Sequence, residues 1–546
     1  MKKGIVALEI IAIAALIGCG IFLGVKAKEC ADIASEGNMY EDTKLVLYDG
    51  PTTMQDATAD DLVRTNEAQR DTTLKHCTDT SVKVNGYDCY VYDTNVNDSR
   101  TWSGNYLPNL SRTPVTYFDF EGVVEVQVTV PDIELESATV SPLSYGIEPV
   151  IDAENHTVTF TVDKADNYTV QFNGDQARAL HIFTYDIETD APSPEDENVI
   201  YFGPGEWNID TYNVADSDTT VYIAGGAVVH GNITANFVDN ITVAGHGILD
   251  GSLYEGWKGS SAKVPLNFNN CKNPILKDVI VLNSNAWVVQ QYNCDGGVID
   301  GLNIISARPN GDGISMQSST NYEIKNCFIR SWDDSLVVKN YSDISSENIT
   351  FSNCQLWTDL AQSMEIGFET NKGCFEDMTI KNIVFEDITV LHNYHKPVIS
   401  VHNSDDAAVS DVVFRNITVE HNTVGTGDSD IKYIIDLLVA SSGWSSTRER
   451  GTISGVTLEN INVLSGTNTS VRISGADAEH GISDVTFKNV NINGEVLTDE
   501  NISKFVGVSN AENPKVEADD DFIKSVAEMA DAATEAADAS TAAAEE

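Results

Sequence analysis

Basic residues are scarce in this sequence, and no two cysteines have the spacing of a metal-binding pair. Lys and Arg number 33 against 83 Asp and Glu, which gives a formal net charge of -50. A chain this acidic repels phosphate, so nucleic acid is excluded as a partner. The nine cysteines include no C-x-x-C, which excludes a cysteine-based zinc site. We therefore expect no nucleic acid, metal or cofactor.

The N-terminal segment, residues 1–28, contains one long apolar run. Two lysines precede Ile5 to Val25, which could span a bilayer although Glu9 interrupts it. An uncleaved anchor, a cleaved signal peptide, a lipoprotein signal ("LIGC") and a prepilin-like leader ("KKGIVALE") all fit, and we favour the first two. Each predicts a secreted or surface-anchored protein, extracellular in location, that meets the membrane only through this segment. We expect a monomer.

The cysteines fall into two groups. Cys77 and Cys89 could form a disulfide in an oxidising compartment. Four others recur at intervals of 23, 33 and 27 residues, which fits one buried position of a repeat: Cys271, Cys294, Cys327 and Cys354.

Residues 29–190 show the alternation of half-buried strands. "VVEVQVTV", "HTVTFTV" and "YTVQF" alternate apolar and polar residues and are separated by short turns such as "DAEN". Several short strands with regular turn signals predict an antiparallel β-sandwich. The polar, proline-containing stretch 186–198 reads as the linker that follows it.

Residues 191–513 are built from a repeat. Segments such as "ENITFSNCQLWT", "IKNIVFEDITVLHN" and "VSDVVFRNITVEHN" recur, mostly every 24 to 32 residues, with Asn, Asp or Gly at the corners. This period without helical stretches predicts a solenoid, and the missing leucine ladder favours a parallel β-helix over leucine-rich repeats. We expect Ile349, Val384 and Val413 to point inward, and Asn348 and Asn416 to be corners. Residues 514–546 read as an acidic, alanine-rich tail.

Three acids interrupt the repeat. Asp312 stands between glycines in "NGDGI", and Asp333 and Asp334 follow about one coil later in "WDDSL". Adjacent coils lie roughly 4.8 Å apart, so these carboxyls should share one wall. An inverting glycosidase needs two carboxyls roughly 6.5–9.5 Å apart, one to protonate the leaving oxygen and one to activate water. Acids that merely end strands and a calcium site are the alternatives.

The chain from about Val199 to Asn493 resembles the polygalacturonase-type glycoside hydrolases of family 28 and their relative family 49. "NGDGI" and "WDDSL" resemble the family's "NTDGI" and "DDC" motifs, and "GHGILDG" followed by Trp257 resembles "GxGxIDG…W". The sandwich ahead of the helix adds a likeness to family 49. The resemblance implies a right-handed β-helix, with Asp333 as general acid and Asp312 and Asp334 holding the water.

Two family 28 elements are missing. The histidine expected after the double aspartate is absent from "AQSMEIG" (361–367), and the "RIK" motif is replaced by "HKPVISVHN" (395–403). Family 49 lacks both, which implies a neutral glycan. A uronate remains open because three basic residues lie near the expected cleft: Arg308, Lys339 and Lys396.

Further substrate contacts are expected from Trp332, Glu365 and His402. Alternation in "SMEIGFE" should turn Met364, Ile366 and Phe368 inward. Glu365 and Glu369 should then face outward.

The sequence thus predicts an all-β, exported glycosidase that cleaves a polysaccharide with inversion. A β-helical polysaccharide lyase that uses calcium and a basic residue is the first rival. A non-catalytic glycan-binding solenoid is the second.

Overall fold

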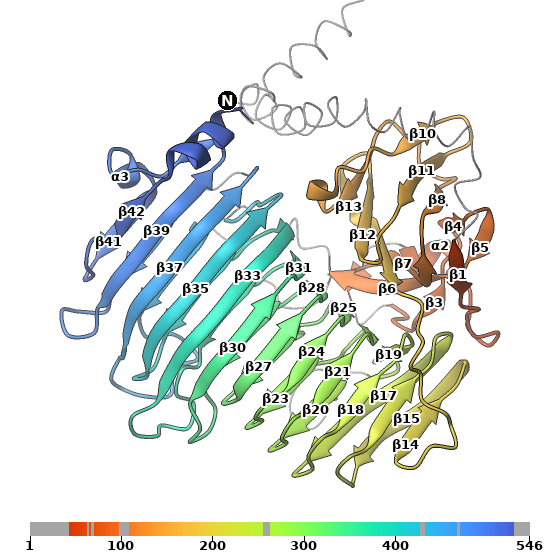
Figure 1. Cartoon of the computed structure of the whole chain (residues 1–546), viewed down its shortest axis with the longest axis horizontal. Helices are drawn as coiled ribbons and strands as arrows, with labels where there is room; N and C mark the ends of the chain where they lie inside the picture. Colours follow the sequence, from red (N-terminus) through yellow and green to blue (C-terminus); the bar gives the residue numbers. More distant parts are fainter. Residues whose placement is uncertain are drawn as a thin grey trace, which may run out of the picture.

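The computed structural model describes residues 43–62, 65–66, 70–97, 109–254, 262–425, 432–466 and 470–528. The predicted export segment and most of the acidic tail lie outside these residues. Within them, no helix has the length and apolarity needed to cross a membrane. Strands dominate, and helices such as α2 (Ala59–Leu62), η2 (Leu143–Tyr145) and α3 (Ile502–Phe505) are single turns between them (Figure 1).

The N-terminal region is a sandwich of two sheets. The larger sheet pairs its strands mainly antiparallel, but β7 and β13 run parallel, which differs from the all-antiparallel expectation. Its strands are β1 (Lys44–Leu47), β2 (Thr65–Asn66), β3 (Lys75–His76), β6 (Val91–Asn97), β7 (Asn109–Glu121), β9 (Ala138–Ser141), β12 (Asn167–Phe172) and β13 (Asp175–Tyr185). The smaller sheet consists of β4 (Ser81–Val84), β5 (Tyr87–Cys89), β8 (Val124–Thr129), β10 (Val150–Asp152) and β11 (Thr157–Val162).

Period-two alternation forms the core between these sheets. In β8 every second residue is buried, so Val124, Val126 and Val128 face Phe118 and Phe120 of the larger sheet. Cys77 and Cys89 are buried in this core as free thiols, so the disulfide that they could have formed is not present.

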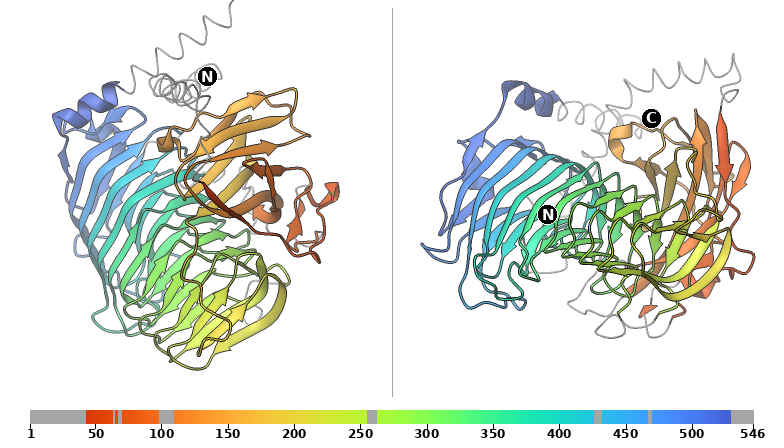
Figure 2. Two further views of the ribbon diagram at one scale, coloured as in Figure 1. Left: turned by 45° about the vertical axis from the view of Figure 1, so that its right-hand side comes forward. Right: turned by 60° about the horizontal axis from the view of Figure 1, so that its bottom comes forward.

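From Val199 to Glu517 the described residues form a right-handed parallel β-helix whose strands, β14 to β42, make three faces (Figures 1 and 2). The face that carries the predicted site is called the cleft face, after the cleft expected from the sequence. Its strands are β20 (Leu266–Asn269), β23 (Val289–Tyr292), β26 (Ile314–Gln317), β29 (Leu336–Lys339), β32 (Met364–Phe368), β34 (Ile399–Asn403), β36 (Ile435–Val439), β38 (Val471–Ser474) and β41 (Val506–Ser509).

The docking face lies against the sandwich. It includes β15 (Gly205–Val214), β17 (Ala227–Asn236), β19 (Ile248–Asp250), β22 (Ile280–Leu282), β25 (Asn303–Ile305), β28 (Phe328–Ser331) and β31 (Gln355–Thr358). The outer face is formed by β14 (Val199–Phe202), β16 (Thr220–Ile223), β18 (Thr242–Ala244), β21 (Ile275–Lys277), β24 (Val298–Asp300), β27 (Thr320–Lys325) and β30 (Ser346–Ser352).

Towards the end of the helix the strands lengthen and bend from the outer face into the docking face. These long strands are β33 (Thr379–Asn393), β35 (Ala408–Val419), β37 (Thr452–Val463) and β39 (Ile482–Ile492). The hairpin strand β40 (Glu495–Val496) follows, and β42 (Lys515–Glu517) pairs in parallel with β39, so the β-helix extends beyond residue 513.

The interior consists of columns in which one residue type repeats from coil to coil. The rings of Phe351, Phe385 and Phe414 stack with centroids 4.7 and 4.9 Å apart and planes 6° from parallel. The four recurring cysteines are buried free thiols in the same core, which confirms that they occupy a buried position of the repeat.

The predicted inward positions are correct for Ile349 and wrong for Val384 and Val413. Ile349 is fully buried and pairs with Ile383, which in turn pairs with Val412. Val384 and Val413 are half-buried on the outer surface, in register with Thr350. In "NIVF" and "DVVF" two adjacent apolar residues compete for the inward position, and a shift of one residue reverses the face.

The corners are lined by ladders of asparagine and aspartate. Asn348 and Asn416 have left-handed backbones (φ of 58° and 55°), which asparagine tolerates. The Asn348 amide donates to Asn321 Oδ1 (2.9 Å), and Asn382 donates to Asn348 Oδ1 (2.7 Å). Both predicted corners are confirmed, and each amide bonds to the coil on either side.

The sandwich packs along the docking face of the helix. A shared hydrophobic cluster joins Tyr92, Tyr117 and Phe183 of the larger sheet to Ile280 and Phe328 of the helix. Two views show the sandwich beside the coils (Figure 2). The docking strands are therefore buried on both sides, which explains why β22 and β28 have no exposed residue.

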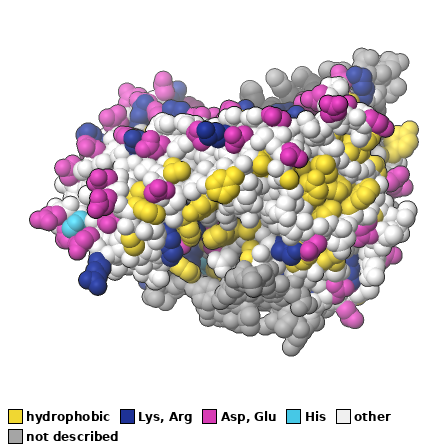
Figure 3. Space-filling view, turned by 90° about the horizontal axis from the view of Figure 1, so that it is seen from below, with side chains coloured by type: hydrophobic (Ala, Val, Ile, Leu, Met, Phe, Trp, Pro, Cys, Tyr) yellow, Lys and Arg dark blue, Asp and Glu magenta, His cyan; other side chains and the backbone are white. Residues whose placement is uncertain are grey.

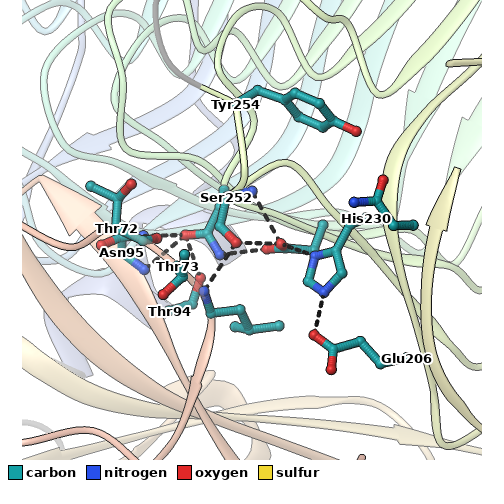
Figure 4. A network of polar contacts seen from close by, with 12 residues as sticks. Thr72, Thr73, Thr94, Asn95, Glu206, His230, Ser252 and Tyr254 are labelled. Atoms are coloured by element: carbon teal, nitrogen blue, oxygen red, sulfur yellow. Dashed lines mark hydrogen bonds and ion pairs between the residues drawn. The ribbon is translucent and has the colours of Figure 1, made fainter. Parts of the chain in front are cut away.

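A buried polar network reinforces this contact (Figure 4). Asp250 accepts hydrogen bonds from Asn283 Nδ2 (2.8 Å) and Ser252, and it pairs with His230 Nδ1 (2.8 Å). Asn283 Oδ1 in turn accepts from Thr94 Oγ1 (3.0 Å) and from Asn95 in the sandwich. The far nitrogen of His230 lies 2.8 Å from Glu206. We call these seven residues the interdomain network.

Charge on the surface is uneven. Viewed from below, acidic side chains gather around the edges of the molecule, and a band of hydrophobic side chains crosses the middle (Figure 3). The large excess of carboxylates in the chain therefore does not cover this face uniformly.

Candidate active site

The three predicted acids come together on two neighbouring coils of the cleft face. Gly313 N donates to Asp334 O (2.8 Å), and Ile314 pairs with Leu336, so Asp312 lies beside Asp334 on the next coil. Each acid precedes a strand, β26 or β29, whose alternate residues lock it into the core. The stacking register differs from the expected one by a single residue, because Asp334 rather than Asp333 aligns with Asp312.

Lys339, at the end of β29, is surrounded by carboxylates. Its Nζ lies 3.3 Å from Asp312 Oδ2, 3.6 Å from Glu369 Oε2 and 3.9 Å from Asp334 Oδ2. Tyr341 donates a hydrogen bond of 2.9 Å to the other oxygen of Glu369. Lys339, Asp312, Asp334 and Glu369 are all less than 10% exposed, so water screens these pairs poorly. We call these four residues with Asp333 the acid cluster.

Asp333 differs from its two neighbours in exposure. It is half-buried, whereas Asp312 and Asp334 are buried. Its Oδ2 accepts the backbone N–H of Asn310 (3.0 Å), and its Oδ1 accepts the N–H of Asp334 (3.1 Å). These two bonds fix the side chain at the surface of the cluster.

The acid cluster favours protonated carboxyls. Burial raises the pKa of Asp312 to about 7, although Lys339 acts in the opposite direction. Burial and the nearby charges of Asp333 and Asp312 raise the pKa of Asp334 well above its usual range, and burial raises that of Asp333. Lys339 keeps its charge, because the carboxylates raise its pKa in spite of burial. Near neutral pH the cluster can therefore both hold and release a proton.

Glu365 and His402 form a second ionic chain next to the acids. His402 Nδ1 lies 2.9 Å from Glu365 Oε1, and its Nε2 lies 3.1 Å from Asp436 Oδ2. Ser400 donates to Glu365, and Arg472 makes two hydrogen bonds to Asp436. Burial alone would lower the pKa of His402, but the two carboxylates raise it to about 10. Glu365 and His402, both predicted as substrate contacts, thus bind each other.

The alternation expected in "SMEIGFE" fails at its end. Met364 and Ile366 are in the core as predicted, but Phe368 is half-buried and stacks on His402 with ring centroids 4.4 Å apart. Gly367 has a φ of 116°, a conformation that breaks the alternation of the strand. A side chain there would collide with His402 O, at 2.0 Å from the added carbon.

The other predicted contacts are less accessible than expected. Arg308 is buried and donates to Thr72 Oγ1 of the sandwich (3.3 Å). Trp332 is 2% exposed, so its ring presents no open face for a sugar in this structure. Lys396 is half-buried on the loop before β34.

The sequence did not single out Tyr341, Asp436 or Arg472. Glu369 shared a predicted strand face with Glu365, and that alternation was the only signal for it. Asp436 and Arg472 pair in register on β36 and β38, about one and two coils beyond His402, where no motif marks them.

Comparison with known proteins agrees with this geometry. The model of "Glycosyl hydrolases family 28" matches residues 219–516, more than half of the chain. The chain belongs to glycosyl hydrolases family 28. This family assignment was predicted from the aspartate motifs, and the matched residues contain the whole acid cluster.

Relatives of this family 28 protein are distant. A polygalacturonase of Medicago sativa is 28% identical over 204 residues, which cover 30% of this chain and 48% of the relative. A polygalacturonase of Nicotiana tabacum is 30% identical over 114 residues, covering 19% and 29%. The chain thus spans about half, or less, of the curated relatives that it matches.

One solved structure matches nearly the whole length of this family 28 protein. Dex49A from Penicillium minioluteum is 14% identical, with 87% of this chain and 98% of that chain covered and a TM-score of 0.51. This similarity concerns the fold, and it confirms the predicted combination of an N-terminal sandwich with a right-handed parallel β-helix.

Proposed function

We propose that this protein is a glycoside hydrolase that cleaves O-glycosidic bonds of a polysaccharide with inversion. The observation that carries the proposal is the convergence of Asp312, Asp333 and Asp334 around one buried lysine. Inverting glycosidases use a carboxylic acid to protonate the leaving oxygen and a carboxylate to activate water. Membership of family 28 supports the same reaction.

In this mechanism Asp333 is the general acid. It alone of the three aspartates is partly exposed, so it can reach the glycosidic oxygen and hand over a proton as the bond breaks. Asp312 and Asp334 position the attacking water and take its proton. Neighbouring carboxyls share protons, and the raised pKa values keep at least one proton on the acid cluster near neutral pH.

The substrate that we propose is an uncharged glycan. Three cations at the site are already compensated: Lys339 by three carboxylates, His402 by Glu365 and Asp436, and Arg472 by Asp436. A polyuronate would add one negative charge per sugar to a cleft where carboxylates outnumber cations. Arg308, which could have bound a uronate, is buried against Thr72.

The same arrangement favours hydrolysis over a calcium-dependent lyase. The ammonium of Lys339 lies among Asp312, Asp334 and Glu369, which is the position that a calcium ion would take in such a cluster. A lyase base must also be neutral to abstract a proton, whereas the carboxylates keep Lys339 charged.

Location and assembly are further parts of the proposal. The apolar N-terminal run supports export, with the enzyme secreted or held at the cell surface. The polysaccharide is the proposed partner, and the protein is proposed to act as a monomer.

A hydrolysis screen with product analysis tests the function. The full chain is incubated with polygalacturonate, carboxyl-reduced polygalacturonate, dextran, pullulan and galactan, and the earliest product is examined by proton NMR. We expect sugar release from at least one uncharged glycan, with inverted configuration. The reduced polymer is the matched control, because it keeps the linkage of polygalacturonate and loses only the charge. Retained configuration, or an unsaturated product, would refute the mechanism.

A further inference from the structure

Glu365 and His402 were predicted to contact the substrate, but both are buried beneath the cleft face. Glu365 is 0% exposed and His402 is 3% exposed. Phe368 covers one side of the imidazole, since the two rings stack with centroids 4.4 Å apart. In this structure a sugar reaches neither charged group, so any part that they play in the reaction must act through other residues.

The two residues belong to an ionic chain built on one row of the cleft face. Glu365 of β32, Ser400 of β34, Asp436 of β36 and Arg472 of β38 pair in register from coil to coil. Adjacent coils lie roughly 4.8 Å apart, so the two carboxylates of this row are two coils from each other. Ser400 has a small side chain, and His402, two residues along the same strand, bridges the carboxylates through its two nitrogens. We call Glu365, His402, Asp436 and Arg472 the ionic chain.

A glycine leaves the space that this bridge needs. His402 pairs in register with Gly367. A side chain at Gly367 would place its first carbon 2.0 Å from His402 O and 3.3 Å from Glu365 Oε1. The bridge between histidine and glutamate therefore depends on a position without a side chain.

Charges alternate along the ionic chain and leave its two ends different. Although burial opposes it, Glu365 and Asp436 raise the pKa of His402 to about 10, so the imidazole is charged near neutral pH. Arg472 makes two hydrogen bonds to Asp436, of 2.7 and 2.6 Å. Two negative and two positive groups give no net charge, but the positive end, Arg472, has a side chain 31% exposed, whereas the negative end, Glu365, is fully buried.

The negative end lies beside the acid cluster. Glu365 pairs in register with Val337, which follows Asp334 by three residues and carries no charge. Gln362, three residues before Glu365, donates its backbone N–H to Asp334 Oδ1 (3.2 Å). Burial is the main cause of the raised pKa of Asp334, and the charge of Glu365 acts in the same direction, together with those of the neighbouring aspartates.

The cations near Glu365 lie on opposite sides of it. Lys339 lies among the aspartates, whereas His402 and Arg472 lie on the later coils. In coil order, the charged groups on the strands around Glu365 are Asp312; Asp333, Asp334 and Lys339; Glu369; His402; Asp436; and Arg472. Tyr341, which bonds to Glu369, is uncharged near neutral pH because burial raises its pKa.

We propose that Glu365 and His402 are positioning residues, which hold the negative end of the ionic chain against the acid cluster and so keep a proton on its aspartates. This proposal rests on the proposed function. The proton is needed because Asp333 passes one to the leaving oxygen. The attacking water returns one to Asp312 or Asp334, so the cluster holds the same number of protons after each turnover.

The ionic chain does what a lone carboxylate at this position could not. An unpaired buried carboxylate is costly and tends to take up a proton itself. Glu365 is instead bonded by the hydroxyl of Ser400 and by His402, and Asp436 and Arg472 complete the pairing of the histidine. Nearby carboxylates favour the protonated form of one another, so a negative charge fixed in this way acts on Asp334.

The pH profile of kcat/KM tests the proposal, because it reports the ionisations of the free enzyme. Glu365→Gln keeps the size of the side chain and removes its charge, so the aspartates should hold their protons less strongly. We expect the half-maximal points on the acid and the alkaline side to fall by about 0.5–1 pH, a roughly three- to tenfold loss of proton affinity. The substrate is the glycan of the hydrolysis screen that the full-length wild type cleaves fastest.

Asp436→Asn is the matched control. It also removes a carboxylate that bonds to His402, so its melting temperature should fall at least as far as that of Glu365→Gln. The removed charge lies two coils, roughly 10 Å, further from the aspartates, and its effect on the pH profile should be less than half as large. Equal movement of both profiles would show an effect of net charge alone and overturn the proposal.

A second variant and a second measurement keep the test independent of folding and of turnover. If Glu365→Gln does not fold, the double variant Glu365→Gln/His402→Gln replaces the ion pair by two amides, and its profile should move in the same direction by a smaller amount. Infrared spectra taken from pH 4 to 9 follow the C=O band of protonated carboxyls, and the part lost in Asp334→Asn is assigned to Asp334. This band should disappear at lower pH in Glu365→Gln than in the wild type.

The outcomes separate the ionic chain from the proposed function. Loss of stability in Glu365→Gln without any movement of the pH profile or of the infrared band would make the chain purely structural and leave the hydrolase standing. Movement to higher pH would also overturn the proposal. An infrared band that moves as expected, in a protein whose wild type cleaves no glycan, would support the electrostatic role of Glu365 and refute the hydrolase.

Discussion

The acid cluster and the interdomain network both bury carboxylates beside a cation, yet their hydrogen bonding differs. In the network, Asp250 is satisfied by Asn283, Ser252 and His230, and His230 is held at both nitrogens. The acid cluster places three carboxyls within 4 Å of Lys339, with Asp333 next to them. Burial together with mutual repulsion raises the pKa of its aspartates. The paired charges of the network hold two domains together, whereas the excess of carboxyls in the acid cluster keeps a proton bound.

Buried charge alone is therefore a poor guide to catalysis. Ion-pair networks that only stabilise a structure also shift pKa values. What distinguishes the acid cluster is that like charges outnumber their counter-ions and that one member, Asp333, is partly exposed.

The largest expected effect is on turnover at the acid cluster. Asp333→Asn keeps the size of the side chain but removes the proton that the leaving oxygen needs. General acid catalysis is worth about 10²–10⁴-fold, and kcat should fall by that factor while substrate binding persists. Substrates with a good leaving group should recover part of the loss. Equal losses on both kinds of substrate would show that Asp333 is not the acid.

The next effect should appear in stability at the interdomain network. Asp250→Ala leaves His230 and Asn283 without their buried partner, and breaking such a pair costs about 3–5 kcal/mol. Denaturant unfolding measures this loss. The folded fraction should keep its activity, and a large fall in kcat at full folding would make the network part of the catalytic machinery.

The pH dependence of stability tests a second polar contact between the two domains, the pair of His246 and Asp119. His246 Nδ1 lies 2.9 Å from Asp119 of the sandwich, and although burial opposes it, pairing with Asp119 and Asp278 raises the histidine pKa to about 9. The stabilisation that this raised pKa brings is fully present below pH ~6.5, the ordinary pKa of histidine. It is lost as the pH rises through about 9, where His246 loses its proton in the folded state.

His246→Gln should therefore lower stability by about 3 kcal/mol at pH 6, and the difference from wild type should vanish towards pH 10. Melting temperatures of both proteins from pH 6 to 10 measure it. A difference that is constant with pH would mean that lost packing against Tyr185, not charge, is responsible.

The smallest expected effect is on stability, at two adjacent valines that carry no charge. It gives a reference value for the changes expected at the acid cluster and the interdomain network. Val412 is buried in the solenoid, and Val413 is half-buried on the outer surface. Val412→Thr places a hydroxyl in the core and should cost about 1–3 kcal/mol. Val413→Thr should stay within about 0.5 kcal/mol. Chemical denaturation compares the two, and the reverse order would contradict the register.

The sequence was sufficient for whatever depends on period and motif. Alternation predicted the sandwich, the repeat predicted the solenoid and its buried cysteines, and spacing predicted that Asp312 lies near the double aspartate. The sequence could not predict which of the first two residues of "IVF" and "VVF" faces the core, because both are apolar. Only the three-dimensional register shows that Ile383 and Val412 point inward.

Long-range partners were equally out of reach. Lys339 was expected to meet substrate, but its carboxylate partner Glu369 comes from the next coil, and no motif marks that pairing. The residues that join the domains, such as Asn95 and Asn283, are separated by 188 positions. Continuous apolar strands such as β22 fit a face that is covered. The same pattern in β29 of the cleft face shows that it does not identify the covered face by itself.

The docked sandwich contacts several coils of the β-helix at once. Without it, each coil would be stabilised only by contacts with the coils next to it. The contacts of the sandwich run from Glu206 to Glu420, through Thr53 at one end and Ser141 at the other. A solenoid stacked in one dimension can fray wherever its nearest-neighbour terms are weakest. Coils from Thr452 onward lie beyond the part of the β-helix that the sandwich contacts. Under heat or mechanical load the β-helix should therefore unfold first at its C-terminal end, and the coils that carry the acid cluster should stay folded longer.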